Sequence, residues 1–298
     1  MTPIERIQAE HGIVGRESEL ALALAVLGSG RHLLLEGPVG VGKTTVALAV
    51  CAHLAKPTVR VDGDDRYSES KLSGWFDPPL VLAEGFSEAS FFAGPLVSAM
   101  RSGAVLFINE LNRMPESVQN VLLPALDEGL VSVPHIGTVT AAEGFQVIAT
   151  QNPVEYVATG HLSEALRDRF EHLVLDYQAA AEEERIVARE TGSADAGLIR
   201  TAVRIARATR SHPAFRKGAS VRAAVATVLL AERLEGEDAL ARAAAAALAT
   251  RVDLRDDIDA DFASALALLL EAVIARGEDP DTGAEAAAEA AREQAKKA

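Results

Sequence analysis

The sequence predicts two domains of different class, an α/β domain over residues 1–177 and an all-helical domain over residues 178–275. In the first domain, short apolar runs typical of strands alternate with helical patterns and glycine punctuation, which favours a parallel sheet flanked by helices. Beyond Tyr177, alanine, arginine and leucine recur at helical spacing and clear strand signals disappear. The expected fold class is therefore a five-stranded parallel α/β sheet followed by a helical domain.

Five apolar runs are the expected strands of this sheet. Each is nearly continuous and bounded by polar or turn residues, as expected of strands that are buried on both faces. They are His32–Glu36, Thr58–Asp62, Ala104–Asn109, Phe145–Thr150 and His172–Asp176. In addition, alternation around Gly137 within residues 130–140 predicts a β-hairpin ahead of the fourth strand.

The second domain is expected to contain four helices. They are Glu182–Ala208, Arg222–Leu234, Asp238–Thr250 and Asp261–Ala275. Arg200, Arg204 and Arg207 share one face of the first helix, because they are spaced i, i+4 and i+7. Contact with a neighbouring subunit and a solvated face are the two interpretations of this stripe. The tail, residues 276–298, is rich in alanine and glutamate and predicts either a solvated helix or a disordered segment.

Charge and composition exclude several classes of function. The 298 residues contain 29 Lys plus Arg and 43 Asp plus Glu, a formal net charge of −14. So acidic a protein does not hold a polyanion non-specifically, which argues against nucleic acid as a partner. Because the N-terminus has no signal-like pattern and no apolar run reaches about 18 residues, we expect a cytoplasmic protein without membrane contact. The single cysteine, Cys51, excludes an internal disulfide.

A glycine-rich motif follows the first expected strand. The segment GPVGVGKT fits G-x-x-x-x-G-K-[ST], with a strand before it and an apolar helical segment after it. Its glycines permit a tight turn that points backbone N–H groups at phosphates, while Lys43 reaches the β- and γ-phosphates and Thr44 places its hydroxyl on Mg²⁺. The motif thus predicts ATP and Mg²⁺ as cofactors. The residues expected to bind them are Gly37, Pro38, Val39, Gly40, Val41, Gly42, Lys43, Thr44 and Thr45.

Polar residues end the third and fourth expected strands, at the sheet edge where an open parallel sheet binds ligands. Glu110 can accept a proton from the attacking water or orient it. Asn109 stands where an acidic residue would normally hold the magnesium shell, so weaker organisation of Mg²⁺ is expected there. Asn152 can hold the lytic water between itself and Glu110.

Five motifs in order resemble the MoxR branch of the AAA+ ATPases. They are GPVGVGKT, FINELNR with PESVQNVLLPALDEG, IATQNP, SEALRDRF and KGASVRA, and the likeness runs over residues 12–223. The resemblance implies that Arg169, in RDRF, is an arginine finger that acts on ATP of the neighbouring subunit; Arg167 is the alternative. It also implies that Arg222 is a sensor residue in the helical lid and that the segment around Val14 lies against the adenine.

By the same resemblance, Lys43 and Thr44 are Walker A residues, Asn109 and Glu110 are Walker B residues, and Asn152 is sensor 1. The family pattern usually has Asp where this chain has Asn109, which bears on the magnesium contact and on the rate of turnover.

The function that the resemblance implies is that of a hexameric ring. It would hydrolyse Mg·ATP at subunit interfaces to remodel or mature a protein client in a chaperone-like manner, and the client would carry a von Willebrand factor A domain. A nucleotide-dependent binding switch with little or no hydrolysis is the alternative, motivated by Asn109. A DNA motor of the same superfamily is disfavoured, because the chain is acidic and shows no extra DNA-binding domain.

An aromatic-rich segment, residues 71–100, separates the second and third expected strands and contains the only tryptophan, Trp75. The family places an insertion here. Contact with a client and packing of the aromatics onto their own domain are the two interpretations of this segment.

Overall fold

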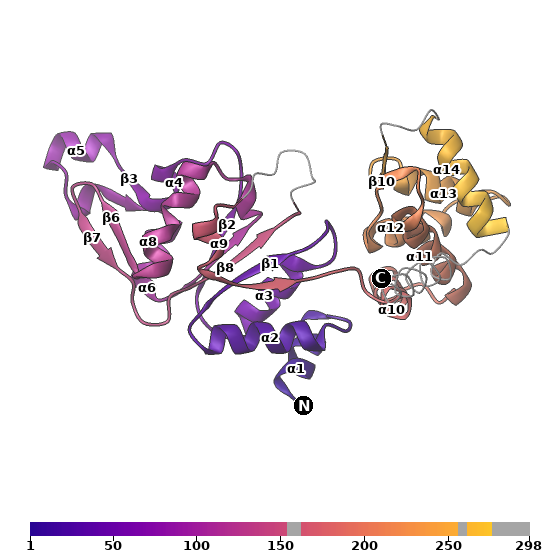
Figure 1. Ribbon diagram of the computed structural model, residues 1–298, viewed down its shortest axis with the longest axis horizontal. Coiled ribbons are helices and arrows are strands. Elements are labelled where there is room, and N and C mark those ends of the chain that lie inside the picture. Colours follow the sequence, from indigo (N-terminus) through magenta and orange to yellow (C-terminus); the bar gives the residue numbers. More distant parts are fainter. Residues whose placement is uncertain (154–161, 256–260, 276–298) are drawn as a thin grey trace, which may run out of the picture. The chain divides into compact units, whose positions relative to one another are not determined.

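A computed structural model describes residues 1–153, 162–255 and 261–275 (Figure 1). The chain divides into two compact units, with the boundary between Asp176 and Tyr177. The predicted tail, residues 276–298, lies outside the described residues. No helix in the described part of the chain is both long and apolar enough to span a membrane.

The first unit is built around strands and short helices (Figure 1). Its strands are β1 (His32–Glu36), β2 (Thr58–Asp62), β3 (Gly74–Phe76), β4 (Phe91–Ala93), β5 (Val105–Asn109), β6 (Leu130–Val133), β7 (Gly137–Thr140), β8 (Gln146–Gln151) and β9 (Phe170–Val174). Its α-helices are α1 (Pro3–His11), α2 (Glu17–Gly28), α3 (Lys43–His53), α4 (Glu69–Ser73), α5 (Pro78–Glu84), α6 (Pro95–Ser102), α7 (Glu116–Asn120), α8 (Leu122–Asp127) and α9 (Glu164–Arg167). The described residues of this unit also include the 3₁₀ turns η1 (Glu88–Ser90) and η2 (Leu111–Arg113).

The central sheet has five strands in the order β2-β5-β8-β1-β9, and every neighbouring pair is parallel. The prediction of a five-stranded parallel sheet flanked by helices is therefore confirmed. The last strand begins at Phe170, two residues before the predicted start, because the buried Phe170 pairs with His32 at the beginning of β1. In this strand order the phosphate loop follows an interior strand of the sheet rather than an edge strand.

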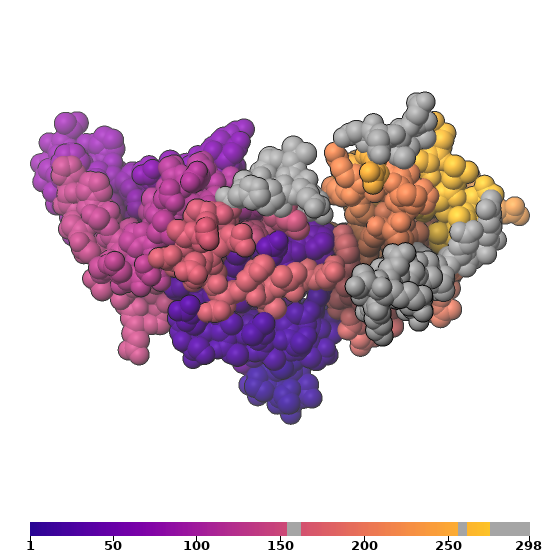
Figure 2. All heavy atoms as spheres, viewed as in Figure 1, coloured from indigo at the N-terminus to yellow at the C-terminus, as the bar shows by residue number. Residues whose placement is uncertain are grey.

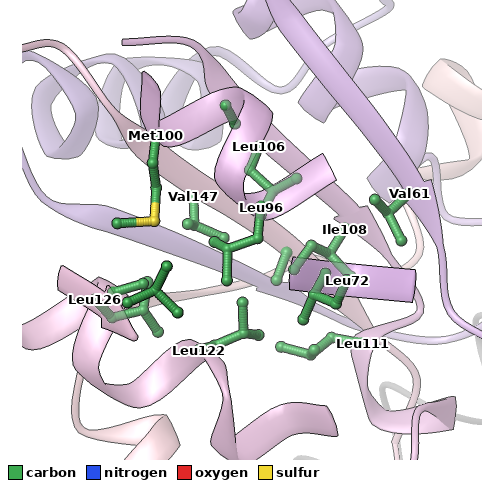
Figure 3. Packing of buried hydrophobic residues seen from close by; sticks show 14 of the residues in the cluster. Val61, Leu72, Leu96, Met100, Leu106, Ile108, Leu111, Leu122, Leu126 and Val147 are labelled. Carbon is green, nitrogen blue, oxygen red and sulfur yellow. The ribbon is translucent and has the colours of Figure 1, made fainter. Parts of the chain in front are cut away.

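Side chains of the central strands are buried on both faces of the sheet. On one face, Leu106 and Ile108 pack against Leu96 of α6 and Leu122 of α8 (Figure 3). Alternate residues of the same strands, such as Phe107, point to the opposite face, where α2 and α3 pack against the sheet. This double burial explains why the strands read as continuous apolar runs.

Two antiparallel two-stranded ladders, β3–β4 and β6–β7, lie at one end of the first unit (Figure 1). Figure 2 shows the atoms of this end of the first unit in purple and magenta. The hairpin predicted around Gly137 is confirmed. In the aromatic segment, Trp75 stacks on Phe92 with ring centroids 5.9 Å apart, and Phe86 stacks on His135 at 4.0 Å. These rings pack on their own unit, yet Trp75, Phe86 and Phe92 remain 50 %, 53 % and 45 % exposed.

Over its described residues, 177–255 and 261–275, the second unit is helical apart from one short ladder. It contains α10 (Ala180–Thr191), α11 (Ala196–Ser211), β10 (Phe215–Lys217), α12 (Val221–Ala231), α13 (Ala239–Leu248), β11 (Asp253–Leu254), α14 (Phe262–Leu270) and a π-helical turn, η3 (Glu271–Ala275). The prediction of one helix over 182–208 is wrong. The chain leaves α10 at Gly192, which has a φ of 69°, and the side chain of Asp195 caps the start of α11.

A buried ion cluster ties α10 to α11. Glu183, whose side chain is 4 % exposed, lies 3.3 Å from Nη1 of Arg207 and 2.8 Å from Nη2 of Arg210. The Arg210 guanidinium also lies 3.8 Å from the ring centroid of Tyr177. Arg207 is therefore packed inside its unit, so the stripe as a whole is neither a solvated face nor a surface free to contact a neighbouring subunit. Arg200 stays 64 % exposed, and for it both interpretations stay predictions.

We expect Leu106→Ala to lower the free energy of unfolding of the first unit by about 2–5 kcal/mol, because a fully buried leucine leaves a cavity. Trp75 is the only tryptophan, so its fluorescence during urea titration reports on this unit. Leu82→Ala, at a position that is 90 % exposed, is the control and should leave the midpoint nearly unchanged. Equal shifts for the two variants would contradict the assignment of the core.

Candidate nucleotide site

Five predicted residues meet at one edge of the central sheet. Lys43 and Thr44 begin α3, directly after the phosphate loop that follows β1. Asn109 ends β5, Glu110 follows it, and Asn152 follows β8. Because β1, β5 and β8 are parallel strands next to one another in the sheet, their carboxyl ends lie together, and hydrogen bonds join residues from the three segments.

The phosphate loop requires glycine for steric reasons. Gly37 has a φ of 157°, and a Cβ there would lie 2.0 Å from the carbonyl oxygen of Leu175. Gly42, with a φ of 97°, precedes α3 and supplies no side-chain cap, which leaves the helix N-terminus suited to an anion. The Lys43 side chain is buried, and its Nζ donates to the carbonyl oxygens of Gly37 and Pro38 at 2.7 and 2.8 Å. The loop is thus folded around the ammonium group.

The amide of Asn109 links three neighbouring segments. Its Oδ1 accepts hydrogen bonds from the hydroxyls of Thr44 and Thr150, both at 3.0 Å. Its Nδ2 donates to Oδ1 of Asp62 at 2.9 Å. A carboxylate only accepts hydrogen bonds, so Asp62 determines which end of the amide faces Thr44.

Asp62 was not among the predicted site residues. It ends β2 and lies opposite Asn109 in the register of β2 and β5. Arg60 donates to both of its carboxylate oxygens, from Nη2 at 2.8 Å and from Nε at 3.1 Å. Hydrogen bonds from Arg60, and further from Asn109, lower the pKa of Asp62 below its ordinary value. It is therefore a carboxylate at neutral pH.

Glu110 has a strained backbone and a held side chain. Its φ of 56° places it in the left-handed region, which costs a non-glycine residue about 1–3 kcal/mol and is most often found at functional sites. Its backbone N–H donates to the Thr150 hydroxyl at 2.8 Å. Asn152 Nδ2 donates to Oε1 at 3.2 Å, and Arg113 Nη1 donates to Oε2 at 2.8 Å. Both carboxylate oxygens are thus directed by neighbouring side chains.

Several residues that form hydrogen bonds with the site residues were not predicted from the sequence. Thr150 and the buried Asn112, whose Nδ2 donates to the Asn152 carbonyl at 3.0 Å, are ordinary polar residues in the sequence pattern. Arg113 stands three residues after Glu110, a spacing at which side chains can meet within one turn. Asp62 carried the strongest signal, since it is an acidic residue at the end of a predicted strand.

The segment around Val14 lies between α1 and α2 and is partly buried. Two residues later, the buried Arg16 donates from Nη2 to the carbonyl oxygen of Val41 in the phosphate loop at 3.1 Å, and also to that of Asp176. Arg16 thereby ties this segment to the loop.

Arg169 lies at the opposite end of the sheet. It directly precedes Phe170, which pairs with the first residue of β1, whereas the phosphate loop follows the last residue of that strand. The strand length puts about 13 Å between these two ends. The Arg169 side chain is 30 % exposed and donates from Nη2 to Asp127 at 3.0 Å, while Arg167 is exposed. Neither arginine is brought to the phosphate loop of its own unit.

Arg222 belongs to the second unit, where it is exposed in the first turn of α12. The structure therefore brings together Lys43, Thr44, Asn109, Glu110 and Asn152, and it does not bring Arg169 to them.

The oxygen atoms at the sheet edge fit a hard divalent cation. The Thr44 hydroxyl and Asn109 Oδ1 are adjacent, and the Asp62 carboxylate lies behind them. Mg²⁺ prefers oxygen ligands and is usually held by one or two side chains together with water and phosphate. In the described part of the chain no three His, Cys, Asp or Glu residues gather as a protein-only metal site.

The remaining reactive side chain, Cys51, is buried in α3. Burial raises the pKa of its thiol to about 11, so it is protonated and unreactive at neutral pH.

The strand, glycine-rich loop and helix, with Glu110 and Asn152 on the neighbouring strand ends, define a P-loop nucleotide-binding protein. Residues 32–170 match the family model of the AAA domain (dynein-related subfamily). The chain is 32 % identical to protein NorQ of Paracoccus denitrificans over 192 residues, 63 % of this chain and 69 % of that protein. It is 29 % identical to the gas vesicle ATPase GvpN of Ancylobacter aquaticus over 231 residues, 72 % of this chain and 64 % of that protein. The chain belongs to the MoxR-type AAA+ ATPases.

Solved structures show the same fold. A point mutant of RuvB from Thermotoga maritima matches with a TM-score of 0.55 and 20 % identity, covering 89 % of this chain and 79 % of that chain. At this identity the likeness concerns the fold alone.

We expect Gly63→Ala to reduce ATP turnover by about 100-fold, because a misplacement of about 1 Å near the reacting groups can cost that much. A Cβ on Gly63 would lie 2.1 Å from the carbonyl oxygen of Glu110 and must displace it. Nucleotide affinity measured without Mg²⁺ should change little, since the loop from Gly37 is untouched. Gly28→Ala is the control, because a Cβ there meets no atom within 4 Å. Equal turnover of the two variants would contradict the role of this contact.

Proposed function

We propose that this chain binds Mg·ATP at the phosphate loop and hydrolyses it. The observation that supports this most strongly is the pairing of Glu110 with Asn152, 3.2 Å apart, at the strand ends next to the loop. AAA+ membership supports nucleotide binding, and the paired side chains supply the groups that hydrolysis needs.

Binding would depend on the loop and on Lys43. The backbone N–H groups of the loop and the N-terminus of α3 favour an anion, and the Lys43 ammonium, now on two loop carbonyls, can donate to a phosphate. Thr44 and Asn109 would hold Mg²⁺, which when bound neutralises charge on the phosphates. Val14 would lie against the adenine, and Arg222 would act from the lid.

Hydrolysis would depend on Glu110. Its carboxylate can accept a proton from the attacking water or orient it, and Asn152 can fix the water and the carboxylate together. Arg113 holds the other carboxylate oxygen, so that Oε1 stays on the side of Asn152. This geometry favours general-base or positional catalysis over direct covalent chemistry.

A binding switch with little hydrolysis is the second candidate. The observation that favours it is the amide at Asn109, which lacks the charge of the usual acidic residue. Such a protein would bind ATP with the same loop and change conformation without rapid turnover.

The two candidates differ in the response to Glu110→Gln. If the chain is an ATPase, turnover should fall by about 10²–10⁴, because the base is lost while the nucleotide contacts remain. Turnover is measured by phosphate release and affinity by a fluorescent ATP analogue. Glu116→Gln, at an exposed position in α7, is the matched control and should retain turnover. If wild type and Glu110→Gln turn over equally, hydrolysis at this site is disproved and the switch remains.

We further propose that the active form is a ring, hexameric as in the family, in which Arg169 acts on ATP held by the neighbouring subunit. The position of Arg169 at the far end of its own sheet supports this, because that side chain cannot complete the site of its own phosphate loop. An arginine supplied to the γ-phosphate stabilises charge in the transition state.

Mixing of two inactive variants tests this arrangement. Arg169→Ala and Lys43→Ala should each abolish turnover alone, and their mixture should recover part of it, because some interfaces then pair an intact loop with an intact arginine. Arg167→Ala should keep turnover, since Arg169 is the expected finger. Failure of every mixing ratio to recover activity would contradict action between subunits.

The partner proposed on the family likeness is a protein client with a von Willebrand factor A domain, on which the ring does chaperone-like work. The half-exposed rings of Trp75, Phe86 and Phe92 offer a contact surface for it. Stimulation of ATP turnover by such a protein, lost on Trp75→Ala, would support this; no stimulation by any such protein encoded beside this gene would count against it.

A further inference from the structure

We propose that Asp62, at the end of β2, supplies the negative charge that Asn109 lacks beside the Mg²⁺ site and holds the Asn109 amide with its oxygen toward Thr44. The proposal rests on the function proposed above. It makes Asp62 a positioning residue, because it would act on the metal through Asn109 and the surrounding field.

A continuous chain of hydrogen bonds joins Asp62 to Thr44 through the Asn109 amide. The Asp62 carboxylate accepts from Asn109 Nδ2 at 2.9 Å, and Asn109 Oδ1 accepts from the Thr44 hydroxyl at 3.0 Å. The Thr150 hydroxyl donates to the same Oδ1 at 3.0 Å, which agrees with this end of the amide being the acceptor. The oxygen that would face Mg²⁺ is thus selected by the carboxylate at the other end.

The register of the sheet explains why a carboxylate on β2 can serve this purpose. Asp62 and Asn109 are direct partners in the parallel pairing of β2 with β5, so their side chains emerge on the same face at the same height. The backbone continues the contact, since the N–H of Gly63 donates to the Asn109 carbonyl at 2.7 Å. Asp62 is therefore held next to Asn109 by the backbone as well as by its side chain.

The carboxylate retains capacity for a further hydrogen bond. A carboxylate offers about four acceptor positions. Two bonds from Arg60 and one from Asn109 occupy three of them on Asp62. The side chain is 59 % exposed, so water has access to the remaining position, including water that belongs to a hydrated cation.

Arg60 balances this charge and limits it. Its guanidinium pairs with Asp62 through two hydrogen bonds and lies 5.9 Å from the ring centroid of Phe107. The opposite charges of Arg60 and Asp62 largely cancel at a distance. Oδ1 of Asp62 nevertheless contacts Nδ2 of Asn109 directly. Arg60 and Asp62 are two residues apart on β2, an edge strand, so their side chains lie on the same face and form an exposed ion pair.

The test measures how Mg²⁺ changes nucleotide affinity in the full chain. A fluorescent ADP analogue is titrated with and without EDTA, and then at increasing Mg²⁺. For Asp62→Asn, the Mg²⁺ concentration at half-effect should rise by about 10–100-fold, as for other residues that orient a metal ligand, while affinity in EDTA should stay at the wild-type value. Asp65→Asn, an exposed neighbour that contacts neither Asn109 nor Thr44, is the control and should behave as wild type.

A double variant that moves the carboxylate from position 62 to position 109 should rescue the Mg²⁺ dependence. The double variant Asp62→Asn with Asn109→Asp returns the negative charge to β5 and should restore the wild-type Mg²⁺ dependence. An unchanged Mg²⁺ dependence in Asp62→Asn would overturn the proposal, as would a loss of affinity in EDTA that the double variant does not repair, since that marks a purely structural role.

The outcome is separable from that of the proposed function. Phosphate release by wild type against Glu110→Gln decides whether the chain hydrolyses ATP. The Mg²⁺ titrations decide the role of Asp62 in a chain that binds nucleotide, whether or not it turns over. A wild type whose nucleotide affinity ignores Mg²⁺ would overturn the assignment of Asp62.

Discussion

The hydrogen bonds of the Asn109 amide are the interaction on which the nucleotide site depends. They join the end of β5 to Thr44 at the start of α3, to Thr150 on β8 and to Asp62 on β2. These groups come within hydrogen-bond distance of one amide because neighbouring parallel strands end at the same edge of the sheet. Thr150 extends the network, because its hydroxyl also accepts the backbone N–H of Glu110. The metal-facing side chains and the catalytic carboxylate are therefore parts of one hydrogen-bonded unit.

The strained backbone of Glu110 and its charged side chain are held by the same part of the structure, the carboxyl edge of the central sheet. Glu110 adopts a left-handed backbone against Gly63, and both of its carboxylate oxygens accept hydrogen bonds from fixed donors. The buried sheet below supports this arrangement, because its strands are packed on both faces and cannot shift independently. The ordered core thus holds a conformation that an isolated loop would not keep.

Much of the fold followed from apolar runs. The starts and ends of β1 and β2 agree with the predicted ranges, because polar or turn residues bound them on both sides. The break at Gly192 was missed, since alanine-rich helical spacing continues on either side of it. The ladder of β10 with β11 has strands of only three and two residues, too short to show a period in the sequence. At the site, motif order indicated Lys43 and Glu110, whereas Asp62 lay outside every motif.

The sequence by itself determined the fold class, the phosphate loop and the order of the motifs. Each depends on neighbouring residues, such as the glycines around Lys43 or the apolar run before Asn109, and local patterns record such dependence. Only the tertiary structure decided which end of the Asn109 amide faces Thr44, that Asp62 stands beside it, and that Arg169 lies away from its own loop. These relations arise from strand order and register, which pair residues distant in the chain and leave no local pattern to read.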